Sequence, residues 1–328
     1  QAYGTTLINF AEKISSFSSP LAVGMSGNFR QMKRRILNIA VFRKETLYQK
    51  MRALIIYLVI SAVFIGCTPI LSIDASTQSV YHFSDTDKNI SLLDISETFG
   101  TYDGSFVLYD NNLDSWKIYD LEEATKRIPP ESTYKIYDAL LGLESGIITP
   151  EHSSMTWNGD AFPFPSWEAD QDLNSAMQNS VNWYFQAIDS QLGINRVQEF
   201  LNKIEYGNQT TSSNLDLYWS DFSLKISPLE QVTLLKKFNT NEFHLNSQNV
   251  FSVKNAIKIA STPNGNFYGK TGTGRVNGQD INGWFIGYVE TSDNSYYFAT
   301  NIQSDSNATG KKAFEITSDI LKKLHIWN

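Results

Sequence analysis

The chain has 328 residues and a formal net charge of −7, and its 41% hydrophobic and 13% aromatic residues exclude a largely disordered protein. The charge is divided unevenly. Residues 1–52 hold nine Lys and Arg against two Asp and Glu, residues 53–73 hold no charge, and residues 74–328 carry a net charge of −14. The acidic C-terminal part excludes direct nucleic-acid binding there. A single Cys excludes a disulfide framework and a Cys-based zinc site.

The uncharged stretch, residues 53–73, has the length of a membrane span. As a helix it would reach about 31 Å, enough to cross the hydrocarbon core of a bilayer. Seven Lys and Arg precede it between residues 33 and 52, and acidic residues follow it. This asymmetry predicts a single-pass protein of the cell membrane with its C-terminal part outside. Two alternatives stay open: a buried core helix, and a lipoprotein signal that starts at Met51 and ends at a lipidated Cys67.

The remaining parts follow from this span. The first residue is Gln and not Met, so we expect the chain to begin inside a longer protein. Residues 1–52 are expected to form a cytoplasmic juxtamembrane tail. Residues 74–100 are polar and rich in Ser and Asp, which predicts a linker. Residues 101–328 are expected to form an extracellular globular domain.

The globular part predicts one α+β domain. In chain order we expect a hairpin over 104–119, a helix from the Pro129-Pro130-Glu131-Ser132 segment to Gly146, and a helix over 197–204. A capping box at 227–230 opens another helix. Strands follow at 266–272, 283–291 and 296–302, and an amphipathic helix covers 313–324. Strands at both ends with helices between and after them indicate a single α+β domain.

Ser132 and Lys135 form the one Ser-x-x-Lys pair of the chain. Ser132 lies at a predicted helix start, where free N–H groups favour a developing oxyanion. Lys135 lies one turn later on the same face, and a serine nucleophile needs such an adjacent base. Lys acts as a base only when neutral, which requires an apolar pocket. The alternative is that Ser132 is a plain helix cap and Lys135 a solvated surface residue.

Two further segments are candidates for the same site. Lys270-Thr271-Gly272-Thr273-Gly274 ends a predicted strand, and its glycines would let a ligand lie against the backbone. Ser180-Val181-Asn182 is weaker alone, because Ser-x-Asn occurs at four other places. These two segments and the Ser132–Lys135 pair make three segments, and their order and spacing along the chain carry more information than any one of them alone.

In that order and spacing, the three segments resemble those of penicillin-recognising serine enzymes. Tyr206-Gly207-Asn208 and Trp219 are similar to the corresponding residues of class D β-lactamases. The segments 127–137, 180–184, 223–227 and 268–274 resemble most closely the BlaR/MecR sensor-transducers, over the membrane span and essentially all of 101–328. That resemblance implies a serine β-lactamase/penicillin-binding fold, with an antiparallel sheet flanked by helices, behind one transmembrane helix.

The resemblance also implies a function and its residues. Ser132 would be acylated by β-lactam antibiotics with Lys135 as the base, modified to a CO2-derived carbamate and covered by Trp219. Ser180 would relay a proton to the lactam nitrogen. Lys270, Thr271 and Thr273 would face the antibiotic carboxylate, with Gly272 between them. The acylated receptor would act through a cytoplasmic protease region on a repressor and so induce resistance genes.

Some features depart from these families. The family's His-Glu-x-x-His zinc motif is absent and the four His are scattered, so we expect no metal site. Class D enzymes usually have an aliphatic residue where Asn182 stands, and an amide there would favour a persistent adduct over turnover. Two rivals stay open: a class D lipoprotein β-lactamase that hydrolyses β-lactams, and a transpeptidase-like cell-wall enzyme.

Overall fold

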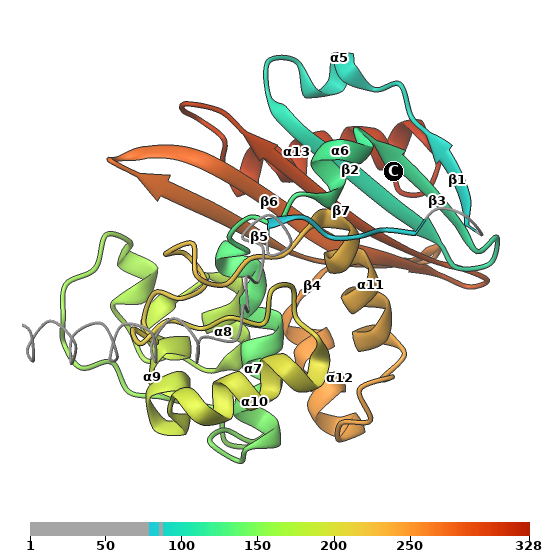
Figure 1. The fold of residues 1–328 in the computed structure, drawn as a ribbon. Helices are drawn as coiled ribbons and strands as arrows, with labels where there is room; N and C mark the ends of the chain where they lie inside the picture. The colour runs from blue at the N-terminus through green and yellow to red at the C-terminus, as the bar shows by residue number, and fades with distance from the viewer. Residues whose placement is uncertain (1–78, 85–87) are drawn as a thin grey trace, which may run out of the picture. The chain divides into compact units, whose positions relative to one another are not determined.

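A seven-stranded sheet organises the part of the chain that the computed structural model describes, residues 79–84 and 88–328 (Figure 1). Its strand order is β1-β3-β2-β7-β6-β5-β4. The strands are β1 (Asn89–Leu92), β2 (Asp103–Asp110), β3 (Ser115–Tyr119), β4 (Lys258–Thr262), β5 (Gly265–Val276), β6 (Gln279–Thr291) and β7 (Ser295–Gln303). Neighbours pair antiparallel except β1 and β3, which are parallel. The expected antiparallel sheet is therefore a mixed sheet.

The helices are mostly short and lie largely between β3 and β4 in the sequence. They are α5 (Ser96–Phe99), α6 (Leu121–Thr125), α7 (Lys135–Glu144), α8 (Leu173–Gln178), α9 (Asn182–Leu192), α10 (Ile194–Ile204), α11 (Pro228–Asn239), α12 (Ser247–Ala256) and α13 (Gly310–Lys323), with 3₁₀ turns η1 (Glu131–Tyr134) and η2 (Pro165–Trp167). No described helix is long and apolar enough to cross a membrane. The expected tail 1–52 and span 53–73 lie outside the described residues.

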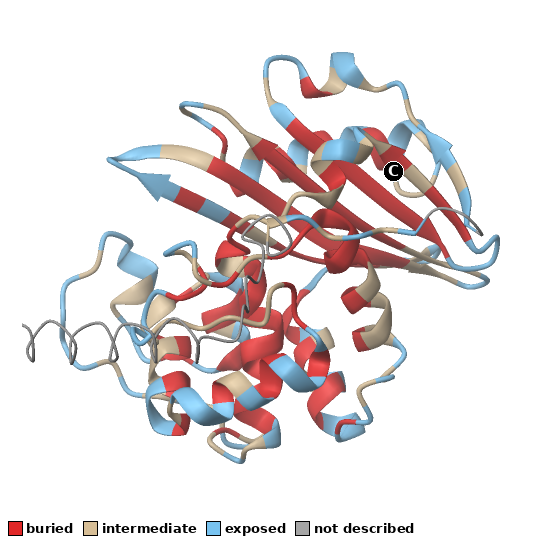
Figure 2. Ribbon diagram, viewed as in Figure 1, coloured by how far each residue is buried: buried red, intermediate tan, exposed pale blue. Residues whose placement is uncertain are grey.

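The sheet separates two hydrophobic cores because successive strand residues point to opposite faces. Phe267 and Phe298 pack in the core that α13 covers, whereas their neighbours Tyr268 and Tyr297 pack in the larger core with the other helices. Figure 2 shows buried residues along the central strands and on the inner faces of the helices. This larger core supports the helices that carry the candidate site.

Most of the predicted elements are confirmed. The hairpin over 104–119 is the β2–β3 pair, and the three C-terminal strands are β5, β6 and β7. The capping box is reciprocal: Ser227 Oγ accepts from Glu230 N, and Glu230 Oε2 accepts from Ser227 N at 3.0 Å. Arg127 donates to the same carboxylate with Nε and Nη2. This ion pair fastens the start of α11 to the chain segment just before the candidate nucleophile.

The expectation that residues 74–100 form a linker has to be corrected. The part of this segment that the structure describes belongs to the domain. Tyr81 N donates to Thr125 O at 2.8 Å, and β1 completes the sheet beside β3. Phe99 is 1% exposed and its ring centroid lies 4.5 Å from that of Tyr119. A few apolar side chains are enough to dock a short strand on the domain. Among many Ser and Asp residues they did not stand out, so the composition of this segment predicted a linker.

Candidate active site

Ser132 lies in the 3₁₀ turn η1, which continues directly into α7. The predicted helix start is thus confirmed, with a tighter first turn than an α-helix. Glu131 just before it has φ 53°, in the left-handed region, which costs free energy for any residue with a Cβ. Its N–H donates to Trp219 O at 3.0 Å. The strained turn is therefore tied to the segment that covers the site.

Lys135 is placed to act on Ser132. Its Nζ donates to Ser132 Oγ at 2.7 Å and to Asn182 Oδ1, at the first residue of α9, at 2.6 Å. The side chain is fully buried. Burial, and then the positive charge of Lys270, hold the pKa of Lys135 well below its usual range. A neutral amine within hydrogen-bond distance of a serine hydroxyl is the arrangement a general base requires.

Aromatic rings enclose the Lys135 amine. Nζ lies 5.7 Å from the ring centroid of Phe185 and 6.0 Å from that of Trp219. Tyr134 stacks on Trp219 with centroids 6.2 Å apart and an interplanar angle of 23°. These rings exclude water, and the low polarity they create favours the neutral amine.

Ser180 and Lys270 form a second pair. Lys270 Nζ donates to Ser180 Oγ at 2.9 Å and to Thr271 O at 3.0 Å. Ser180 has φ 56°, in the left-handed region, two residues before the first residue of α9. Burial lowers the pKa of Lys270 to about 7. The pair joins β5 to the start of α9 across the site.

Strand β5 lies directly against the turn that carries Ser132. Its pairing with β4 ends near Gly269, whose N–H donates to Ile257 O at 2.9 Å, so the strand has a free edge beyond that point. A Cβ at Gly272 would approach Pro130 O to 3.1 Å and Ser132 N to 3.3 Å. Thr273 Oγ1 accepts from Gly310 N at 2.8 Å. Glycine at 272 therefore allows the close approach of strand and nucleophile.

A cavity of about 350 Å³ contains most of the expected site residues. Its walls include Ser132, Ser180, Asn182, Thr271, Gly272 and Thr273. Lys135, Lys270 and Trp219 do not line this cavity and instead hold or cover the residues that do. The structure thus brings all nine expected residues to one place.

Sequence reasoning missed the other wall of this cavity. It is formed by Phe164, Ser166, Trp167, Asn179, Arg275 and Asp280. Arg275 is paired with Asp280, Nε to Oδ1 at 2.7 Å. Three aromatic residues within residues 162–167 were a usable sequence signal, and in the structure the ring centroid of Trp167 lies 5.8 Å from that of Phe162 and 5.3 Å from that of Phe164. Phe185 gave no comparable signal, because its sequence spacing is that of an ordinary core residue.

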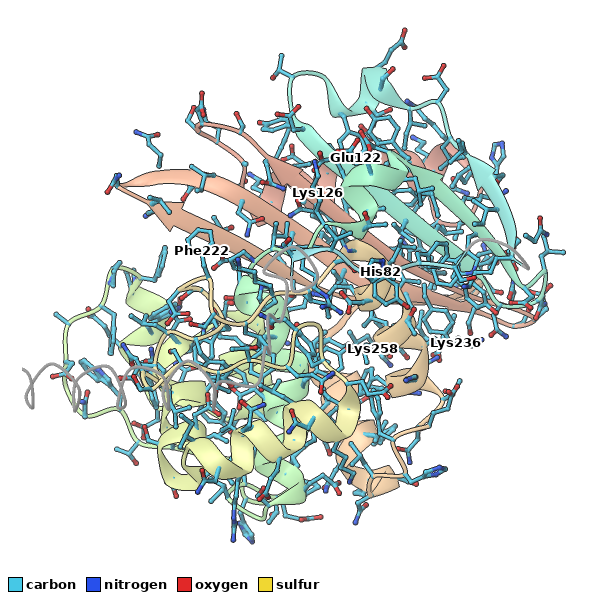
Figure 3. All side chains as sticks on the ribbon, viewed as in Figure 1. His82, Glu122, Lys126, Phe222, Lys236 and Lys258 are labelled. Carbon is cyan, nitrogen blue, oxygen red and sulfur yellow. The ribbon has the colours of Figure 1, made fainter. Side chains whose placement is uncertain are left out.

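Glu131 has an unusual place for a carboxyl group. It is 5% exposed, accepts from Asn282 Nδ2 at 3.2 Å, and would collide with any Cβ at Gly274. Burial raises the pKa of Glu131 to about 8, so the group is neutral at neutral pH. Glu131 also lines a smaller cavity of about 130 Å³, together with the exposed Phe222 (Figure 3). A neutral acid beside Ser132 does not oppose a developing oxyanion.

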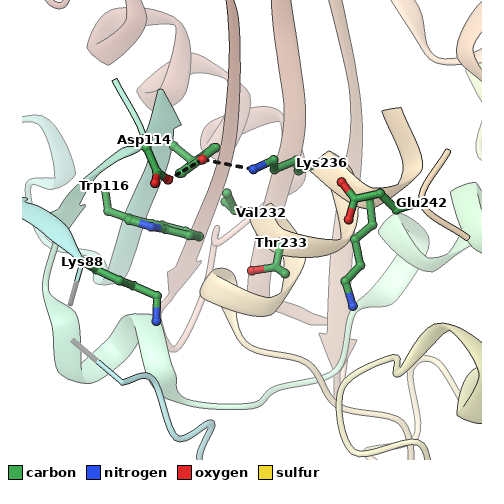
Figure 4. A pocket seen from close by; sticks show the side chains of 9 residues that line it. Lys88, Asp114, Trp116, Val232, Thr233, Lys236 and Glu242 are labelled. Carbon is green, nitrogen blue, oxygen red and sulfur yellow. Dashed lines mark hydrogen bonds between the residues drawn. The ribbon is translucent and has the colours of Figure 1, made fainter. Parts of the chain in front are cut away.

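A further cavity, of about 310 Å³, lies between α11 and the β2–β3 hairpin (Figure 4). Lys236 Nζ donates to Tyr109 Oη at 3.0 Å, and this hydroxyl donates to Asp114 at 2.6 Å. None of the nine expected site residues lines it. Among residues 79–84 and 88–328, no group of three or more His, Cys, Asp or Glu is placed to hold a metal ion.

Comparison with known proteins gives the family. Residues 101–322 match the family model described as the penicillin binding protein transpeptidase domain. The chain belongs to this penicillin-binding family. It is 42% identical to Regulatory protein BlaR1 of Bacillus licheniformis, over 99% of this chain and 54% of that protein. The chain therefore spans about half the length of this relative.

Within the penicillin-binding family, both receptors and hydrolases are similar to the chain. The C-terminal domain of the Bacillus licheniformis BlaR penicillin-receptor matches with a TM-score of 0.72 and 45% identity, over 74% of this chain and 99% of that one. Probable beta-lactamase YbxI of Bacillus subtilis is 37% identical over 72% of this chain and 86% of that protein. The predicted resemblance to the BlaR/MecR sensor-transducers and the penicillin-binding fold are thus confirmed.

Proposed function

We propose that the chain is the sensor part of a membrane-bound β-lactam receptor, and that its penicillin-binding domain is acylated at Ser132. The observation that carries the proposal is the double hydrogen bond of the buried Lys135 Nζ, to Ser132 Oγ and to Asn182 Oδ1. With Lys135 as the neutral amine, the first contact lets Nζ accept the Ser132 hydroxyl proton. The second places an amide that favours the free amine over a carbamate, which suits a lasting adduct and not rapid turnover.

The acylation step follows from the contacts. Ser132 Oγ attacks the lactam carbonyl carbon while Lys135 Nζ accepts the hydroxyl proton. The carbon–nitrogen bond of the lactam breaks, and the nitrogen takes up a proton delivered through Ser180, which Lys270 orients at 2.9 Å. Backbone N–H groups of Ser132 and Thr273 would hold the carbonyl oxygen as its charge develops. Lys270, Thr271 and Thr273 would bind the carboxylate of the antibiotic.

The persistence of the adduct rests on the base. Hydrolysis of the ester requires a group that activates water, and a general base contributes about 10²–10⁴ in rate, or roughly 3–5.5 kcal/mol. Because Asn182 Oδ1 accepts from the Lys135 amine, it would favour the free amine over its carbamate, and once the carbamate is lost after acylation no strong base remains to activate water. An adduct formed beside Lys135 would therefore remain long enough to signal.

A carbamate on Lys135 is part of the proposal. The pKa of Lys135, lowered by burial, favours the neutral amine that reacts with CO2, and the rings of Phe185 and Trp219 would shelter the product. Asn182 would have to turn its NH₂ group toward the added carboxylate. The group would supply a stronger base for acylation than the free amine.

The membrane and signalling roles are proposals as well. Residues 53–73 would span the cell membrane and residues 1–52 would lie in the cytoplasm, as their charge distribution predicts. Acylation would then reach a cytoplasmic protease region that acts on a repressor. The matching relative is named a regulatory protein, which supports a signalling role over a purely hydrolytic one.

The alternative is a class D β-lactamase, which the similarity to YbxI favours. One experiment distinguishes the two. Intact-mass spectrometry after a single dose of penicillin should show one added drug per chain that persists for many minutes, and Ser132→Ala should show none. Covalent uptake by Ser132→Ala would overturn the nucleophile assignment. Disappearance of the adduct within seconds, with product release, would establish the hydrolase instead.

A further inference from the structure

Two carboxyl groups are buried next to the site and take no part in the chemistry above. Asp138 on α7 and Asp189 on α9 are both 0% exposed. None of their four carboxyl oxygens has a hydrogen-bond partner of normal geometry among the described residues. Burying a carboxyl group without partners is costly, so two of them in one place require an explanation.

The two groups lie on the helices that hold Lys135. Asp138 follows Lys135 by three residues, one helical turn, so both side chains are on the same side of α7. Asp189 lies seven residues after Asn182, two turns along α9, on the side of the amide that contacts Lys135 Nζ. Helices α7 and α9 pack against each other. The same helix pair thus fixes the base, its amide neighbour and the two carboxyl groups.

The carboxyl groups act on each other. Burial raises the pKa of both, that of Asp189 to about 8, and the charge of Asp189 raises the pKa of Asp138 further. The Asp138 carboxyl in turn lowers the pKa of Asp189, and two buried carboxyl groups coupled in this way do not both ionise, so the pair shares a proton. The Tyr218 hydroxyl lowers the pKa of Asp189 and the charge of Asp216 raises it.

The pair also acts on Lys135. Negative charge on Asp138 favours the Lys135 ammonium, and the ammonium in turn favours the Asp138 carboxylate. The other titratable groups that face Lys135 are Lys270 on β5, whose positive charge disfavours the ammonium, and Glu131 in η1, which favours it when ionised. Neither Asp138 nor Asp189 lines the two cavities near Ser132.

We propose that Asp138 and Asp189 are positioning residues that share one proton and, through its location, set whether Lys135 is an amine or an ammonium ion. The inference rests on the proposed function, since the pair would control the base that activates Ser132. The amine supports acylation. The ammonium, with a counter-charge one turn away, cannot activate water, so an adduct formed beside it persists.

The pH profile of acylation tests this proposal with the full chain. In Asp138→Asn the ammonium loses its counter-charge, so the pKa of Lys135 falls and more amine is present at low pH. The acylation rate is measured with a fluorescent penicillin as a function of pH. We expect the acidic limb of this profile to move about one pH unit lower, so that the rate at a given pH on this limb is about tenfold higher. Asp189→Asn should move it in the same direction, and the double variant by less than the sum, because the two groups share one proton. Asp138→Glu should retain the wild-type profile.

Controls separate this role from a structural one. Asp319→Asn removes an exposed carboxyl of α13 and should leave the profile unchanged. Thermal unfolding identifies variants that are merely unstable. Folded Asn variants with an unmoved acidic limb would overturn the proposal.

A spectroscopic titration gives a test that does not depend on the variants folding. In bicarbonate-free buffer, where Lys135 carries no carbamate, its ¹³Cε signal in the drug-free wild type, assigned with Lys135→Ala, should change with pH in two steps because its titration is coupled to that of the pair. A single step would overturn the proposal. Failure of the wild type to acylate would instead contradict the proposed function, and the titration would still decide on the carboxyl pair.

Discussion

The amide oxygen of Asn182 accepts a hydrogen bond of 2.6 Å from Nζ of Lys135, the same atom that donates to Ser132. An amide can hold the amine in place, whereas an aliphatic side chain would leave it free and would protect a carbamate. The identity of this one side chain therefore bears on whether the domain acts as a receptor or as a hydrolase.

Replacing Asn182 with Val should speed the release of bound drug. The variant removes the acceptor from Lys135 and leaves Ser132, Ser180 and Lys270 unchanged, so acylation should survive. We expect release to be about tenfold faster, which corresponds to about 1.4 kcal/mol of barrier. The measurement is the loss of covalently bound fluorescent penicillin over time, with Asn179→Val at the cavity wall as a matched control. Unchanged slow release would remove Asn182 as the cause of persistence.

Carbamylation of Lys135 should be visible directly. With ¹³C-labelled bicarbonate at neutral pH, the drug-free chain should show a carbamate signal that is lost in Lys135→Ala, whereas Lys236→Ala should retain it. The reason is that burial holds the pKa of Lys135 well below its usual range, so the reactive amine is populated. A full acylation rate in bicarbonate-free buffer at low pH would show that the amine suffices without the modification.

The acylation rate should fall on the alkaline side because Lys270 loses its charge. Burial lowers the pKa of Lys270 to about 7, so its ammonium form declines above that pH in the drug-free protein. Together with the deprotonation that Lys135 needs, this predicts a bell-shaped profile. Lys270→Arg keeps a positive charge at all accessible pH values and should lose the alkaline limb, although its overall rate should be lower. An alkaline limb that persists in this variant would assign the titration to another group.

Glu131 should make the stability of the domain depend on pH. Its pKa in the folded state is raised to about 8, above the value near 4.5 of an exposed glutamate, so the folded state binds the proton more tightly. The contribution of Glu131 to the free energy of unfolding is therefore fully present below about pH 4.5. It is lost as the pH rises toward 8. Glu131→Gln, which mimics the neutral acid, should be more stable than the wild type at pH 8 and closer to it at pH 5. Urea unfolding at both pH values measures this, with the exposed Glu199→Gln as control. Equal differences at the two pH values would contradict the assignment.

The candidate site was largely predictable because its chemistry is encoded locally. A Ser-x-x-Lys pair at a helix start places the nucleophile and the base one turn apart. The glycine at position 272 is needed because strand β5 lies directly against the turn that carries the nucleophile. Asn182 and Lys135 come from different helices, and the sequence indicated their contact only through resemblance to a known family. The charge pattern that predicts a span at 53–73 remains a prediction, because that segment lies outside the described residues.

The remaining features depend on tertiary packing. The wall formed by Phe164 and Trp167 comes from the short 3₁₀ turn η2 and its first flanking residue, where no helix or strand periodicity indicates a position. The pairing of Asp138 with Asp189 requires knowledge of how α7 and α9 face each other. Strand β1 is short and mostly exposed, so its alternation was too weak to identify, and its parallel pairing reverses the pattern of the rest of the sheet.

The docking of residues 79–100 has a consequence for any attempt to isolate the domain. A recombinant fragment that begins at residue 101 would lose β1 and the buried Phe99, and it would leave the backbone of β3 with an unpaired edge. Unpaired edges recruit strands from other molecules, so this fragment should self-associate. A fragment that begins before Val80 keeps the edge covered and should stay monomeric in light scattering at the same concentration.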